Sequence, residues 1–112
     1  MISITGGAFQ NLLGAPLAAG TLMLKLSQDS TESVTSPGNT VFAGPKITLT
    51  LDSQGNCPAT SIWSNAELNE AGTYYSVNLF DVNGIAVLES PLNWAFTQTS
   101  GTVNLGSMTN SV

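Results

Sequence analysis

The chain has no histidine and no arginine, and charged side chains of any kind are scarce. Among its 112 residues only 8% are charged, against about 25% in an ordinary soluble domain. Lys25 and Lys46 are the whole basic complement, and the formal net charge is −5. Nucleic-acid backbones and anionic membrane surfaces are bound by clusters of Lys and Arg. The sequence therefore argues against a nucleic-acid partner and against a membrane partner.

Cysteine is almost absent as well. The single Cys57 excludes an internal disulfide and any metal site made of several cysteines. A catalytic thiol needs a histidine or another cation beside it to stabilise the thiolate, and Gly55-Asn56-Cys57-Pro58 offers none. We interpret Cys57 as a small, semi-buried hydrophobic residue.

The seven acidic residues do not suggest a catalytic pair. Glycosidase chemistry needs two carboxyl groups facing one cleft, one of them with a raised pKa. Only Glu67 and Glu70 are neighbours at helical spacing, with nothing polar and rigid expected beside them. The other carboxylates belong to predicted turns and loops: Asp29, Glu32, Asp52, Asp81 and Glu89. We expect no enzymatic activity, no catalytic residues and no cofactor.

Calcium is the metal ion whose binding motif the sequence matches best, and the match is partial. Asp81-x-Asn83-Gly84 begins like a calcium loop, but the later ligands and the closing glutamate are missing. A tight hairpin loop of the form D-x-x-G explains the same residues, because the Asp caps its own turn and the Gly supplies a positive φ. We predict a turn here and no metal site.

What the chain does contain is alternation of apolar and polar residues with a period of two, without persistent helical periodicity. Turn signals separate these runs: Asp52-Ser53-Gln54-Gly55 repeats the D-x-x-G form, and Gly14-Ala15-Pro16 and Ser36-Pro37-Gly38-Asn39 mark longer connections. Short strands at a spacing of roughly 8–12 residues predict an all-β fold, an antiparallel β-sandwich of about seven or eight strands.

The apolar side of the alternation predicts the core. The residues expected there are Leu22, Leu24, Leu26, Ile47, Leu49, Leu51, Trp63, Tyr75, Val77, Leu79, Trp94 and Phe96. The stretch 28–40 has little apolar content, and we expect an exposed, mobile loop. Residues 65–72 have the composition of one helical turn.

The length and pattern indicate one domain. We assign residues 1–105 to the sandwich and residues 106–112 to a C-terminal tail that is flexible or faces a partner. Strand-like alternation begins at Met1-Ile2-Ser3-Ile4-Thr5, without the basic and apolar segments of a secretory signal. We expect synthesis in a host cytoplasm without a signal peptide.

Two groups of motifs resemble known families. Gly14-Ala15-Pro16-Leu17 resembles the G-x-P-L that separates the first two strands, a hairpin, in transthyretin-like and carboxypeptidase-regulatory-like sandwiches. Farther along, Leu51-Asp52-Ser53-Gln54-Gly55-Asn56, Ile62-Trp63-Ser64-Asn65 and Ala71-Gly72-Thr73-Tyr74-Tyr75 follow in order. Together with the opening segment, this layout resembles small immunoglobulin-like domains of tailed-bacteriophage virion proteins, which occur in tail fibres, tail tubes and head decorations.

A further likeness, to the antibody strand that carries a tyrosine corner and the second cysteine, fails. It rests on Glu70–Val77, but Ser76 stands where the cysteine would be. The alternation also places Tyr75 and Val77 on the apolar face, the opposite parity to the antibody pattern. We expect an immunoglobulin-like sandwich without these hallmarks.

The scarce charge leads to the first functional hypothesis. Exposed sheet edges normally carry Lys and Glu that prevent association, whereas the polar positions here are mostly Thr, Ser and Asn. We interpret the chain as a structural protein of a bacteriophage virion, present in multiple copies that decorate the head or form part of the tail or a fibre. Its expected partners are other virion proteins, further copies of itself, or both.

The second hypothesis is a carbohydrate-binding or adhesin-type surface module with a glycan as its partner. Aromatic side chains stack on sugars, and the candidates are Trp63, Trp94, Tyr74 and Tyr75. Trp94 shares its parity with Leu92 and Phe96 and is expected in the core. Tyr74 is then the candidate most exposed to solvent.

Overall fold

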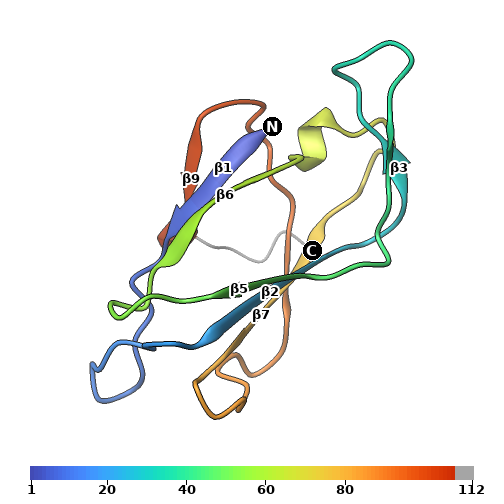
Figure 1. Cartoon of the computed structure of the whole chain (residues 1–112). Helices are drawn as coiled ribbons and strands as arrows, with labels where there is room; N and C mark the ends of the chain where they lie inside the picture. Colours follow the sequence, from blue (N-terminus) through green and yellow to red (C-terminus); the bar gives the residue numbers. More distant parts are fainter. Residues whose placement is uncertain (108–112) are drawn as a thin grey trace.

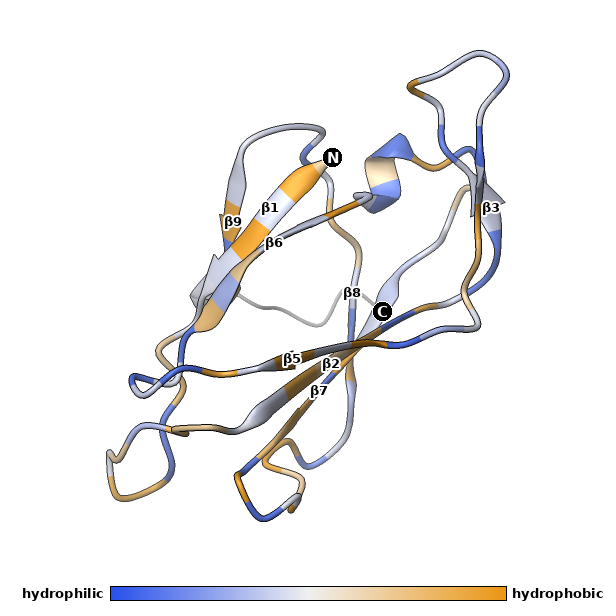
Figure 2. Ribbon diagram, in the orientation of Figure 1, coloured by the Kyte–Doolittle hydropathy of each residue, from blue (hydrophilic) through white to orange (hydrophobic). Residues whose placement is uncertain are grey.

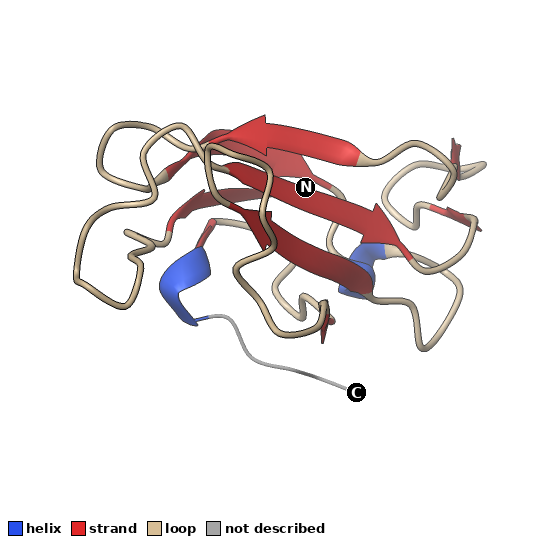
Figure 3. Cartoon of the chain, turned by 90° about the horizontal axis from the view of Figure 1, so that it is seen from below, coloured by secondary structure: helices blue, strands red, loops and turns tan. Residues whose placement is uncertain are grey.

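The computed structural model describes residues 1–107, which form two β-sheets packed face to face. Figure 3 shows that nearly all regular structure is strand, with two short helical turns. The elements are β1 (Ile2–Gly6), β2 (Thr21–Leu26), β3 (Ser30–Thr31), β4 (Thr40–Val41), β5 (Ile47–Thr50), β6 (Cys57–Ile62), η1 (Asn65–Glu67), β7 (Tyr75–Phe80), β8 (Leu92–Trp94), β9 (Thr102–Asn104) and η2 (Leu105–Ser107).

The smaller sheet has the strand order β6-β1-β9, and the larger has the order β5-β2-β7-β8 (Figure 1). Strands β3 and β4 form a separate two-stranded ribbon. Neighbouring strands are antiparallel except β1 and β9, which run parallel with Ser3 opposite Thr102. The predicted all-β sandwich is confirmed. The described residues hold nine strands instead of seven or eight, because β3 and β4 are too short to show alternation.

The period of two decides which side chains face the core. In β7, Tyr75, Val77 and Leu79 are almost fully buried, whereas Ser76 and Asn78 remain partly accessible. A shift of one residue would bury Ser76 and Asn78 instead, at the cost of desolvating their polar groups. The parity predicted from the sequence is therefore confirmed, and it is opposite to that of the antibody strand.

Most of the predicted core is buried. The buried members are Leu22, Leu24, Leu26, Leu51, Tyr75, Val77, Leu79, Trp94 and Phe96. Ile47, Leu49 and Trp63 also pack against this core, but they are only partly buried. Ile47 and Leu49 lie on β5 and Trp63 follows β6, and these strands are edges of their sheets. An inward-facing residue on an edge strand has a neighbouring strand on one side only, so solvent reaches it from the other.

The segment around Gly14 joins the two sheets. Strand β1 pairs with β6 and β9, whereas β2 pairs with β5 and β7. The hairpin implied by the transthyretin-like resemblance is therefore wrong, because the strands on either side of Gly14-Ala15-Pro16-Leu17 are not neighbours. A single bridge between Gln10 and Pro16 closes a small loop within this crossing.

The stretch 28–40 is not the wholly exposed loop that its composition predicts. Ser30 and Glu32 are 6% and 1% exposed. The backbone N–H of Ala43 donates to Asp29 Oδ1 over 2.7 Å and fixes the start of the segment. Residues 33–37 at the tip are exposed, as expected. Composition misjudged the segment because hydrogen bonds, and no apolar side chain, hold it against the domain: the N–H of Ser33 donates to Glu67 O, and the N–H of Asn69 donates to Thr31 O.

The helical turn predicted within residues 65–72 is present as η1. Gly106 and Ser107, which the sequence assigned to the tail, belong to η2, where Asn104 accepts hydrogen bonds from both residues. The rest of the predicted tail, residues 108–112, lies outside the described residues. Within residues 1–107, no helix is both long and apolar enough to cross a membrane.

Candidate functional site

Three loops of the sandwich share one construction. Each begins with Asn11, Asp52 or Asp81, whose Oδ1 accepts hydrogen bonds of 2.8–3.1 Å from the backbone N–H groups two and four positions later. The residue three positions later is always a glycine with a φ of 75–79°, a conformation that other residues adopt only with strain. The D-x-x-G turns predicted at Asp52 and Asp81 are confirmed, but the turn at Asp52 joins β5 to β6 in the other sheet and is therefore not the predicted hairpin loop. The loop at Asn11 was missed, although N-x-x-G is the same signal.

All three loops lie at one end of the sandwich. The Asn11 loop leads into the start of β2, while the Asp52 and Asp81 loops follow the ends of β5 and β7, which pair antiparallel with β2. Figure 1 shows them together, away from the N-terminus. The N–H of Ala8 donates to Asn56 Oδ1 over 2.8 Å and ties the first loop to the second. We call this part of the molecule the loop end.

The tips of two of these loops carry exposed apolar side chains. Leu12 and Leu13 are 105% and 92% exposed, and Val82 and Ile85 are each more than 60% exposed. Figure 2 shows these tips in the hydrophobic colour. We call Leu12 and Leu13 the leucine knob. Apolar side chains gathered on loops with fixed geometry are typical of a surface that contacts another molecule.

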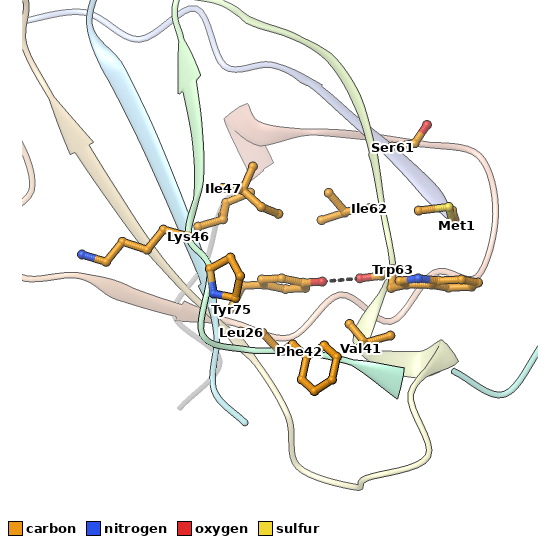
Figure 4. Close-up of a pocket in the computed structure, with 12 residues that line it drawn as sticks. Met1, Leu26, Val41, Phe42, Lys46, Ile47, Ser61, Ile62, Trp63 and Tyr75 are labelled. Atoms are coloured by element: carbon orange, nitrogen blue, oxygen red, sulfur yellow. Dashed lines mark hydrogen bonds between the residues drawn. The ribbon is translucent and has the colours of Figure 1, made fainter. Parts of the chain in front are cut away.

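An apolar cleft opens in the opposite half of the molecule, between the edge strands β5 and β6 (Figure 4). Its volume is about 280 Å³. Its lining comes from Met1, Leu24, Leu26, Val41, Phe42, Pro45, Lys46, Ile47, Ser61, Ile62, Trp63 and Tyr75. Phe42 is 69% exposed at the rim. Inside, the hydroxyl of Tyr75 donates a hydrogen bond of 2.6 Å to the carbonyl oxygen of Trp63, which joins the walls supplied by the two sheets.

Glu67 is a buried residue in the same half of the molecule, where it links Met1 to the segment that follows β6. Its Oε2 lies 2.8 Å from the amino group of Met1, and its Oε1 accepts a hydrogen bond from the N–H of Ser64. Burial acts to raise the pKa of Glu67, but the Met1 ammonium and the Ser64 N–H outweigh it, so that the pKa lies below its ordinary value. The expectation that Glu67 has no polar, rigid neighbour is therefore wrong. Glu70 is exposed and takes no part in this ion pair.

Glu32 holds the loop between β3 and β4 in a similar way. Its Oε1 accepts hydrogen bonds from the hydroxyl and N–H of Thr35 and from the N–H of Asn39. The hydroxyl of Thr35 lowers the pKa of Glu32, and the two N–H groups add to this effect against desolvation. Its Oε2 is buried without a hydrogen-bond partner among the described residues. These contacts organise the loop, so Glu32 and Glu67 serve two separate structural roles.

The four aromatic candidates do not form one platform. Trp94 is buried and stacks on Phe96 at 4.5 Å between ring centroids, which confirms its expected place in the core. Tyr75 is buried and forms a T-shaped pair with Phe96, with 5.7 Å between the ring centroids. Trp63 lines the apolar cleft. Tyr74 is partly exposed and lies outside the cleft lining.

Cys57 is 2% exposed, so it is more deeply buried than the semi-buried hydrophobic residue that the sequence predicted, and burial raises the pKa of its thiol. Residues 1–107 hold no cluster of three or more His, Cys, Asp and Glu side chains able to bind a metal ion together. At Asp81, the loop's own backbone N–H groups use Oδ1.

No protein-family model matches this sequence, and no curated protein is significantly similar to it. The leucine knob and the apolar cleft are the two features of the described residues that bear on function. Of the predicted aromatic candidates, the structure brings Trp63 and Tyr75 together at the cleft and leaves Trp94 and Tyr74 outside its lining. The sequence missed Leu12 and Leu13 because a local pattern does not tell an exposed leucine from a buried one.

Proposed function

We propose that the chain is a non-enzymatic structural subunit of a bacteriophage particle. It is present in many copies, and it decorates the head or forms part of the tail or a fibre. Its partners are other virion proteins and further copies of itself. The layout of turns and aromatic residues that resembles phage immunoglobulin-like domains supports this choice of assembly, and so does the scarcity of charge.

One observation carries the proposal: a leucine knob that is fully exposed and yet held in a fixed loop. Each exposed leucine leaves apolar area in water at a cost of about 25 cal/mol per Å². The hydrogen bonds from Leu13 and Ala15 to Asn11 Oδ1 define the loop conformation before any partner arrives. A contact residue ordered in advance loses less entropy on binding. An exposed apolar surface of fixed conformation is suited to a subunit that binds neighbouring proteins in an assembly.

Immunolabelling of virus particles tests the proposal. The phage to be used is one whose genome encodes this chain. Antibodies raised against the purified chain should label intact particles of this phage at regular positions visible by electron microscopy. Mass spectrometry of gradient-purified particles should then find the chain in many copies. Particles that lack the chain, while the lysate supernatant contains it, would contradict the proposal.

Glycan binding is a second candidate function, favoured by the presence of Trp63 and Phe42 in one cleft. A glycan array probed with the purified chain tests it. Reproducible binding that is lost in Trp63→Ala, and kept in a Tyr74→Ala control, would favour this function. Binding that is absent, or equal in both variants, would reject the cleft as a sugar site.

A further inference from the structure

The two exposed apolar features of the chain differ in shape. The leucine knob projects from the loop end, whereas the apolar cleft is a hollow of about 280 Å³ in the opposite half. Strand direction separates them: the knob precedes the start of β2, and Leu24 and Leu26 in the later part of the same strand line the cleft. A projection and a hollow of the same apolar character are complementary.

Both features are fixed by hydrogen bonds within the chain. At the knob, the N–H of Phe9 donates to Gly55 O and the N–H of Leu17 donates to Phe9 O, at 3.0 and 2.9 Å. At the cleft, the bond between Tyr75 and the carbonyl of Trp63 joins the two walls. Neither surface needs to reorganise in order to meet a partner, which favours association between preformed shapes.

Charge distinguishes the loop end from the lining of the cleft, which holds Lys46 and no carboxylate. The loop end carries the carboxylates of Asp52 and Asp81 and no lysine, whereas Lys46 lies exposed at the rim of the cleft. An acidic knob end approaching a basic cleft rim is an attractive arrangement, and two knob ends facing each other would repel. An anionic lipid surface would also repel the knob end.

From these observations we infer that the leucine knob of one copy inserts into the apolar cleft of a second copy. The contact uses two different surfaces and is therefore heterologous, so each copy offers a free knob and a free cleft to the next, and repetition builds an open filament or a closed ring. This inference rests on the proposed function and names the neighbour within the assembly. In a closed ring every copy is held by two such contacts, so the ring is more stable than a single contact with a dissociation constant of about 1 mM.

Complementation between two variants tests the direction of the contact. Leu12→Ser/Leu13→Ser removes the knob, and Phe42→Ser/Lys46→Glu alters only exposed residues at the cleft. Sedimentation velocity should show wild-type mass rising with concentration up to about 1 mM, with both variants monomeric. An equimolar mixture should form a 1:1 heterodimer and nothing larger, because one good knob meets one good cleft. Val34→Ser, an exposed apolar position outside both features, should assemble like the wild type.

Several results would overturn the inference. The wild type remaining monomeric throughout, or the cleft variant assembling as well as the wild type, would each reject the contact between knob and cleft. A mixture that stays monomeric would reject its heterologous form. Circular dichroism and denaturant midpoints equal to those of the wild type exclude misfolding as the cause. If particles are labelled by the antibody while the wild type alone stays monomeric, the proposed function stands and this inference fails.

Discussion

The two ends of the sandwich hold their chain segments in different ways. At the loop end, three five-residue loops are each closed by one short Asn or Asp side chain that bonds within its own loop. At the cleft end, longer segments are held by buried glutamates. Glu67 reaches Met1, 66 positions earlier, and its carbonyl accepts the hydroxyl of Ser33, 34 positions away.

The two ends therefore differ in the sequence separation of the residues whose contacts fix them: it is short at the loop end and long at the cleft end. An Asx side chain reaches only the nearest backbone N–H groups, so residue type and spacing are enough to specify the loop. The ion pair between Glu67 and Met1, by contrast, joins two segments that are distant in sequence and meet only in the folded protein. The loop end therefore presents a surface that local sequence specifies, whereas the cleft exists only after both sheets have packed.

The largest effect is expected within the loop end itself, from replacing Gly55. Gly55→Ala forces an alanine to a φ of 75° and places its Cβ against the backbone oxygen of Phe9. Strain and overpacking together should cost more than about 3 kcal/mol in the free energy of unfolding. Gly84→Ala is the matched control, since it has φ of 79° and no atom within 4 Å, and should cost about 1–2 kcal/mol. Equal losses in urea denaturation would show that the contact with Phe9 is unimportant.

Removing the buried carboxylate at the cleft end should have the next largest effect. Glu67→Ala leaves the N–H of Ser64 without its acceptor and the Met1 amino group without its partner. We expect a loss of about 1–3 kcal/mol in unfolding free energy. Glu70→Ala, at an exposed neighbouring position, should change it by less than about 0.5 kcal/mol. If both variants unfold at the same urea concentration, the ion pair does not stabilise the fold.

Acid should weaken the cleft end. The pKa values of Glu32 and Glu67 both lie below their ordinary values in the folded chain. Their stabilising contribution is therefore fully present above about pH 4.5 and is lost as the pH falls towards the folded pKa values. The urea midpoint of the wild type should drop between pH 5 and pH 3, and the drop should be smaller in Glu32→Gln and Glu67→Gln. An unchanged drop in both variants would assign the acid sensitivity to other groups.

Opening one Asx loop should cost less than removing the buried carboxylate. Asn11→Ala removes the acceptor of the hydrogen bonds from Leu13 and Ala15, and we expect a loss of about 1 kcal/mol. Asn11→Asp keeps the acceptor and should restore stability, since Asp52 and Asp81 occupy the same position in the other loops. Failure of the aspartate to restore it would mean that the three loops are not equivalent.

The smallest effect on stability is expected at the leucine knob. Leu12→Ser/Leu13→Ser changes two exposed side chains that no core residue covers, so the unfolding free energy should move by less than about 0.5 kcal/mol. Thermal unfolding of the dilute protein measures this directly. A loss above about 2 kcal/mol would show that these leucines support the fold and are not reserved for contact.

Features that depend on residues close together in the sequence were predicted well, whereas features that depend on residues far apart in the sequence were not. The period of two assigned Tyr75, Val77 and Leu79 to the core correctly, because alternation along a strand is local. The same reasoning did not tell that Ile47 and Leu49, which pack against the core, would be only partly buried, since edge positions depend on how strands are ordered in the sheet. The exposed leucines, Leu12 and Leu13, were missed for a similar reason, because their exposure depends on the tertiary arrangement of the segments around them.

The sequence by itself determined the strands that alternate, their inward faces and the turns at Asp52 and Asp81, because hydrogen bonds within five residues and the pleat of a strand need no distant partner. Only the tertiary structure decided that β1 and β2 join different sheets, that Glu67 meets Met1, and that an apolar cleft opens between β5 and β6. These features depend on contacts between segments far apart in the chain. Their stability comes from the packing of the whole sandwich, which no local pattern contains.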